Sequence, residues 1–108
     1  MSLTTAQFHN ELDRIQNAIE DIFDASALDI DIEQSGGVLT VRFSNNSQLI
    51  ISRQEPLKQL WVAARSGGFH CDSIDGNWFC RASQETLAQL LTRITLEQSG
   101  ESLDFSKL

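Results

Sequence analysis

The stretch that decides the fold is LDIDIEQSGGVLTVRFSNNSQLIIS, residues 28–52. In residues 28–33, Leu and Ile alternate with Asp and Glu, which is the pattern of a strand with one buried and one solvated face. A Gly-Gly pair turns the chain into a second alternating run at residues 38–43, and Asn45-Asn46 suits a two-residue turn into a third run at residues 48–52. These runs predict a meander of three antiparallel strands.

Three further strands are expected downstream, at residues 59–64, 69–74 and 77–81. The strongest hairpin signal in the chain is Asp75-Gly76, which separates the last two. The sheet is therefore expected to contain about six strands.

One helix is predicted before the strands in the chain and another after them. Residues 5–24 carry an amphipathic stripe, and Thr4 with Gln7 fits a capping box at its start. Ser83 is the expected N-cap of a second helix that ends near Gly100. The apolar positions with helical spacing are Phe8, Leu12, Ile15, Ile19, Ile22 and Phe23 in the first helix and Leu87, Leu90, Leu91 and Ile94 in the second.

The order helix, strands, helix predicts an α+β two-layer sandwich, expected as a single domain over residues 1–108. Because no helix separates the strands, the sheet must be antiparallel, and both helices can bury their stripes only on one of its faces. The other face should be partly bare. Trp61 lies in a run that is apolar on both faces, so the sequence leaves open whether it is exposed; exposed beside Arg53 and Gln59, it would be a protein-contact hot spot.

Composition excludes several classes of function. The 108 residues are 41% hydrophobic, and the longest apolar run is the five residues 60–64, so we expect a cytoplasmic protein that does not engage a membrane. The net charge of −7 argues against nucleic acid as a ligand. Residues 1–33 carry eight acidic side chains and one basic one, whereas residues 34–108 carry seven of each, so all the excess charge lies in the first third of the chain.

Six carboxylates of that first third form the main candidate site, which we term the acidic ridge: Glu20, Asp21, Asp24, Asp29, Asp31 and Glu33. Clustered carboxylates without Cys or His suit hard cations such as Fe²⁺, Fe³⁺, Mn²⁺, Ca²⁺ and lanthanides. The alternative is a solvated polar face. Three of the acids lie where the helix macrodipole disfavours anions, and this arrangement opposes local stability, which favours a functional role.

Other chemistry-bearing residues are sparse. His70 and Asp72 share one strand face and form a candidate auxiliary metal site, while His9 is a weaker candidate ligand. Counting back from the Asp75-Gly76 turn places Cys71 opposite Cys80, and in a reducing cytosol we expect two free buried thiols. Hydrolase, kinase and dinucleotide-binding motifs are missing from the sequence, so no enzyme activity is predicted.

The sequence resembles the bacterial frataxins. The resemblance is carried by GGVLTV at residues 36–41, SRQEPLKQLWVA at residues 52–63, GGFH at residues 67–70 and DGNW at residues 75–78, together with the acidic first helix and strand. It spans nearly the whole chain. One departure is Ala25, which stands where a further acid is common and thins the acidic ridge by one charge.

The resemblance implies an iron-binding adaptor or regulator of iron–sulfur cluster assembly. In that reading the acidic ridge binds Fe²⁺ or Fe³⁺ weakly, and Glu20, Asp21 and Asp24 also dock on the cysteine desulfurase. A sheet face comprising Arg53, Gln59 and Trp61 would extend the contact toward the scaffold protein. Two alternatives stay open: a ferroxidase with iron storage, or a purely electrostatic adaptor for a basic protein. A monomer is expected, with iron-dependent oligomers as the alternative.

Overall fold

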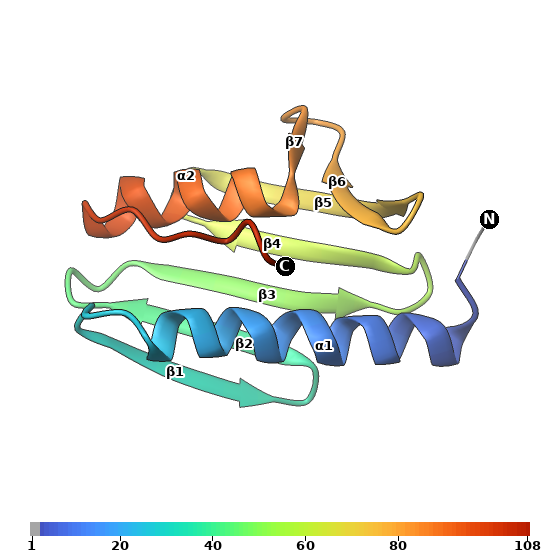
Figure 1. The fold of residues 1–108 in the computed structure, drawn as a ribbon, viewed down its shortest axis with the longest axis horizontal. Coiled ribbons are helices and arrows are strands. Elements are labelled where there is room, and N and C mark those ends of the chain that lie inside the picture. Colours follow the sequence, from blue (N-terminus) through green and yellow to red (C-terminus); the bar gives the residue numbers. More distant parts are fainter. Residues whose placement is uncertain (1–2) are drawn as a thin grey trace.

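The computed structural model describes residues 3–108 as two helices packed on one face of a seven-stranded antiparallel sheet (Figure 1). The strands lie in the sheet in their sequence order, so each pairs with its neighbour along the chain. This confirms the predicted two-layer α+β sandwich. The elements are α1 (Thr5–Asp24), β1 (Ile30–Ser35), β2 (Val38–Phe43), β3 (Gln48–Gln54), β4 (Gln59–Ala64), β5 (Gly67–Ile74), β6 (Asn77–Cys80), β7 (Glu85–Thr86) and α2 (Leu87–Ser99).

The start of the second helix differs from the prediction. Thr86, not Ser83, is the N-cap of α2, and its hydroxyl accepts a hydrogen bond from the Gln89 backbone N–H at 3.2 Å. The Gln89 side chain accepts in return from the Thr86 N–H at 3.0 Å, which completes a capping box. Thr86 has a Gln three residues on, whereas Ser83 does not, so the reciprocal cap forms only at Thr86. The two residues before α2 instead pair with β6 as the short strand β7, which the sequence did not predict.

The turn between β2 and β3 is also longer than the predicted two residues. The register pairs Arg42 with Gln48, and the Phe43 N–H donates to the Ser47 carbonyl at 2.9 Å. Asn46 has a φ of 71° and donates its N–H to the Phe43 carbonyl at 3.0 Å. The left-handed conformation of Asn46 makes this a three-residue hairpin loop, because asparagine tolerates that region of backbone space. The first strand begins at Ile30, two residues later than predicted.

The hydrophobic core lies between the sheet and the two helices. It contains the predicted α1 stripe, except that Ile22 is only partly buried, and the inward residues of β2 to β6. The chain after α2 runs back between the two helices (Figure 1), where the Phe105 side chain is fully buried with its ring centroid 5.6 Å from that of Phe23. This segment completes the core and was not predicted. Neither helix within residues 3–108 has the length and apolar character needed to cross a membrane.

Candidate functional site

The helical half of the acidic ridge lies on the outer side of the last turns of α1. Ile19 and Phe23 point into the core, and helical periodicity therefore turns Glu20, Asp21 and Asp24 outward. Asp21 and Asp24 are exposed, and Glu20 is half-buried. The last turn of α1 contains no basic residue, so no side chain of that turn offsets the carboxylates at the negative end of the helix dipole.

The strand half of the ridge lies on β1, the edge strand beside α1. Ile30 and Ile32 pair with the buried Phe43 and Val41, which places both isoleucines on the helix-covered face. Strand alternation therefore turns Asp31 and Glu33 to the open face of the sheet, and both are exposed. Asp29, just before β1, is exposed as well. The ridge consequently wraps around one edge of the sandwich, with carboxylates on both sides of β1.

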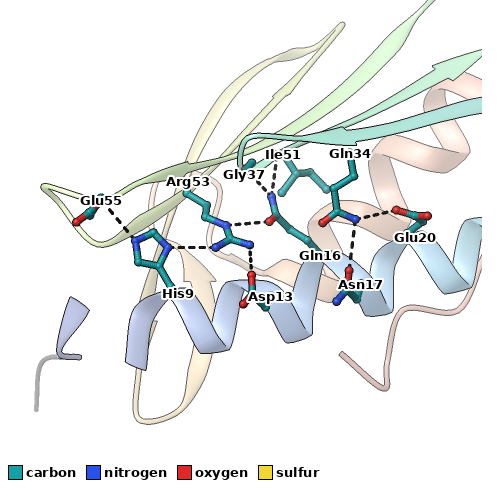
Figure 2. A network of polar contacts seen from close by, with 10 residues as sticks. All are labelled: His9, Asp13, Gln16, Asn17, Glu20, Gln34, Gly37, Ile51, Arg53 and Glu55. Atoms are coloured by element: carbon teal, nitrogen blue, oxygen red, sulfur yellow. Dashed lines mark hydrogen bonds and ion pairs between the residues drawn. The ribbon is translucent and has the colours of Figure 1, made fainter. Parts of the chain in front are cut away.

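Two neighbouring side chains hold parts of this ridge. The Arg42 guanidinium on β2 lies 3.6 Å from the Glu33 carboxylate, and Arg42 is also the register partner of Asp31. On the helix-covered face, the Gln34 amide donates to the Glu20 carboxylate at 2.7 Å (Figure 2). Arg42 therefore offsets one charge of the strand half, whereas no ion pair within residues 3–108 involves Glu20, Asp21 or Asp24.

No group of three His, Cys, Asp or Glu side chains within residues 3–108 is placed to hold one metal ion together. The ridge side chains are accessible to water, and solvated carboxylates bind hard cations weakly and with little selectivity. The ridge therefore presents several solvated carboxylates that can bind cations weakly, and a negatively charged surface.

We expect the repulsion along the helical half to appear in thermal stability. Like charges at i,i+4 on a helix cost about 0.2–0.5 kcal/mol per pair, and 1 kcal/mol corresponds to about 4–8 °C in a domain of this size. Raising NaCl from low to moderate concentration screens this repulsion and should raise the melting temperature by a few degrees. The variant Glu20→Gln/Asp21→Asn/Asp24→Asn should melt higher at low salt and gain less from added salt. An equal salt increment in the variant would contradict this explanation.

The open face of the sheet carries the second predicted group of residues. Trp61 on β4 stacks on His70 of β5, with ring centroids 4.3 Å apart and an interplanar angle of 13°. The Trp61 indole N–H donates to the Gln59 side chain at 2.9 Å, and the Gln59 amide donates to the Asp72 carboxylate at 3.0 Å. The second carboxylate oxygen of Asp72 lies 3.7 Å from the Arg81 guanidinium. The sequence did not decide which face of the sheet carries Trp61. The register places Trp61 on the open face, away from the helices.

The predicted auxiliary pair, His70 and Asp72, does share this face of β5. Each side chain is engaged elsewhere, however: His70 with the Trp61 ring and Asp72 with Gln59 and Arg81. The structure therefore organises these residues as a row of polar and aromatic contacts across neighbouring strands.

Arg53 does not belong to the open face, which corrects the predicted grouping of Arg53 with Gln59 and Trp61. It follows the buried residues Leu49 and Ile51 with the same parity along β3, so its side chain points to the helix layer. Only 15% of the side chain is exposed. Its guanidinium donates to Gln16 at 3.0 Å, contacts a His9 ring nitrogen at 3.1 Å and pairs with Asp13 (Figure 2).

Gln16 is the centre of this network and was missed by the sequence reasoning. Its side chain is fully buried, and its amide donates to the carbonyls of Gly37 at 2.9 Å and Ile51 at 3.1 Å. The only sign of this burial in the sequence is that Gln16 directly follows Ile15 of the apolar stripe in residues 5–24. His9, the weaker ligand candidate, also lies here, with its second ring nitrogen 3.4 Å from Glu55 (Figure 2). The network ties α1 to β3 and serves the fold.

Comparisons with known proteins agree with this architecture. Residues 1–101 match the family model described as a frataxin-like domain. The chain is 60% identical to the iron-sulfur cluster assembly protein CyaY of Ectopseudomonas mendocina and 59% identical to that of Stutzerimonas stutzeri, with the whole of each chain covered. Frataxin from Psychromonas ingrahamii superposes with a TM-score of 0.89 at 34% identity, covering 96% of this chain and 99% of that one. This chain therefore belongs to the frataxin-like family.

Proposed function

We propose that this protein is an adaptor or regulator of iron–sulfur cluster assembly that binds Fe²⁺ or Fe³⁺ weakly on the acidic ridge. Relatives of the same length, about 60% identical, carry the name iron–sulfur cluster assembly protein, which supports the process. The observation that carries the proposal is the unbalanced charge of Glu20, Asp21 and Asp24 at the end of α1. These carboxylates supply the oxygen ligands that iron ions accept in a solvated site.

We further propose that the cysteine desulfurase docks on the same carboxylates. A negative surface of this kind attracts a basic patch on a protein partner and accelerates their encounter. Iron and the desulfurase would then compete for the helical half of the ridge, because both bind through the same oxygens. Partner binding should accordingly weaken as the salt concentration rises.

The open face of the sheet is the proposed continuation of this contact toward the scaffold protein. Trp61 is a suitable anchor because its ring is already fixed by stacking on His70 and by the hydrogen bond to Gln59. Asp31 and Glu33 lie on that same face, so the strand half of the ridge and the Trp61 region share one side of the molecule. Arg53 is left out of this surface, since its guanidinium is engaged with α1.

Reversing the three charges of the helical half tests the proposal. The variant Glu20→Lys/Asp21→Lys/Asp24→Lys should bind Fe²⁺ at least tenfold more weakly and should no longer associate with the desulfurase, while its circular dichroism stays that of a folded protein. The two affinities are measured by isothermal titration under nitrogen and by surface plasmon resonance.

A matched control reverses three exposed acids near the C-terminus, Glu97→Lys/Glu101→Lys/Asp104→Lys. It changes the net charge by the same amount and should leave both affinities within about twofold of the original. Equal losses of affinity in the two variants would show that binding depends on the net charge alone and not on the position of the ridge. Unchanged binding in the ridge variant would overturn the proposal.

A further inference from the structure

The chain contains two cysteines, and the fold brings them together. Cys71 on β5 and Cys80 on β6 are direct partners in the antiparallel register, which confirms the pairing predicted from the Asp75-Gly76 turn. Both side chains are fully buried, and both thiols are free. Neither residue belongs to the acidic ridge or to the Trp61 face, because both point into the helix-covered layer of the sheet.

The position within the hairpin is favourable for a covalent link. Ile74 and Asn77 flank a two-residue turn and close it as a hydrogen-bonded pair. Hydrogen-bonded and non-hydrogen-bonded pairs alternate along an antiparallel ladder, so the Cys71–Cys80 pair, three steps away, is of the non-hydrogen-bonded kind. At such pairs the Cα atoms are about 4.5 Å apart, within the span of about 4.4–6.8 Å that disulfides bridge.

We propose that Cys71 and Cys80 are a redox pair that forms a cross-strand disulfide on exposure to a small disulfide oxidant such as glutathione disulfide. One cysteine thiolate attacks the oxidant, forms a mixed disulfide and releases one glutathione thiol. The second cysteine thiolate then attacks the protein sulfur of the mixed disulfide and releases the second glutathione. The protein loses two protons and two electrons, and one glutathione disulfide becomes two glutathione molecules.

The closed hairpin protects the thiols, so the reaction depends on local opening. The pKa of Cys71 is raised to about 12, mainly by burial and secondly by the neighbouring Cys80 thiol. The Cys71 thiol therefore stays protonated and unreactive at neutral pH. The hairpin lies at the end of the sheet, where β6 has four residues and β7 only two. The residues on either side of β6 include Asp75 and Gln84 with φ of 52° and 57°, a region that non-glycine residues seldom adopt. Local opening of the edge strand β7 and of β6 would expose the two thiols.

The disulfide would be a covalent cross-link at this end of the sheet. It would join β6 to β5 directly beneath the residues that carry the Trp61 face, because Cys71 lies between His70 and Asp72 in the chain. Opening of β6 and β7 would then require movement of β5 as well. Oxidation should therefore rigidify this end of the sheet without changing the acidic ridge.

The test uses the full-length protein, incubated folded at pH 8 with excess glutathione disulfide and analysed by mass spectrometry and by thiol titration after unfolding. The expected result is a monomer lighter by two hydrogen atoms, with both of its two thiols lost. Amide hydrogen exchange at Asn77 and Phe79, whose N–H groups face β5 in the hydrogen-bonded pairs, should slow at least tenfold in the oxidised protein, and reduction with dithiothreitol should restore the original rate. The single variants Cys71→Ser and Cys80→Ser should show no such slowing after the same treatment.

Two results would overturn the proposal. One is retention of both thiols by the folded protein under conditions that oxidise a urea-unfolded sample. The other is oxidation that yields only glutathionylated monomers or disulfide-linked dimers, since either product shows that the native register does not favour the internal bond.

Discussion

Replacing Phe105 by alanine is expected to lower the free energy of unfolding by about 3–5 kcal/mol, the range typical of a buried phenylalanine. The side chain is fully buried and contacts Phe23 of α1, although it belongs to a segment without regular secondary structure. Its removal would leave a cavity between the two helices, and the loss of this anchor would release the C-terminal segment from the core. Urea denaturation followed by circular dichroism measures the change.

The control for this variant is Leu57→Ala, in the turn between β3 and β4. Leu57 is 60% exposed, so its truncation should change the free energy of unfolding by less than about 0.5 kcal/mol. A loss of less than about 1 kcal/mol for Phe105→Ala would contradict the placement of the C-terminal segment in the core.

The second large effect is expected at Arg53. The variant Arg53→Met keeps the aliphatic stem but removes the guanidinium, which leaves the buried Gln16 oxygen without its donor. An unsatisfied buried polar group costs about 1–3 kcal/mol, and the contacts to His9 and Asp13 are lost as well. We expect a decrease of about 2–3 kcal/mol in the free energy of unfolding, measured by urea denaturation.

Arg42→Met is the matched control, because the side chain of Arg42 is 46% exposed and its ion pair with Glu33 lies in solvent. Such pairs contribute about 0–1 kcal/mol. The opposite pattern would contradict the assignment of Arg53 to the helix layer: full stability in Arg53→Met combined with lost desulfurase binding would return this residue to a docking surface.

Much of the fold could be predicted because the sequence alternates cleanly. The pattern of residues 28–52 determines the meander, and the Asp75-Gly76 turn determines the register that pairs the two cysteines. The same alternation places Arg53 with Leu49 and Ile51 on the helix-covered face, so the predicted grouping of Arg53 with Trp61 disregarded the two-residue period of this strand. Burial of Phe105 could not be predicted, because it depends on packing between two helices that are distant in the sequence.

The position of the acidic ridge in the fold could also be predicted from the sequence. The six carboxylates are close in sequence, so their gathering at one edge followed from the helix and strand periods. Their counter-groups were not predictable in this way. Arg42 reaches Glu33 only through the β1–β2 register, and Gln34 reaches Glu20 only because α1 lies over the edge strand. Of these two contacts only the Arg42 ion pair offsets charge, and it does so on the strand half of the ridge.

Iron binding on the acidic ridge is tested most directly by titrating the isotopically labelled protein with Fe²⁺ under nitrogen while following its backbone amide resonances. We predict shifts and line broadening confined to residues 20–33, with the strongest effects at Glu20, Asp21 and Asp24. Changes centred on His70 and Asp72 would instead place the metal on the open face of the sheet. The absence of any localised change would contradict iron binding on the ridge and leave it as a docking surface for a basic protein.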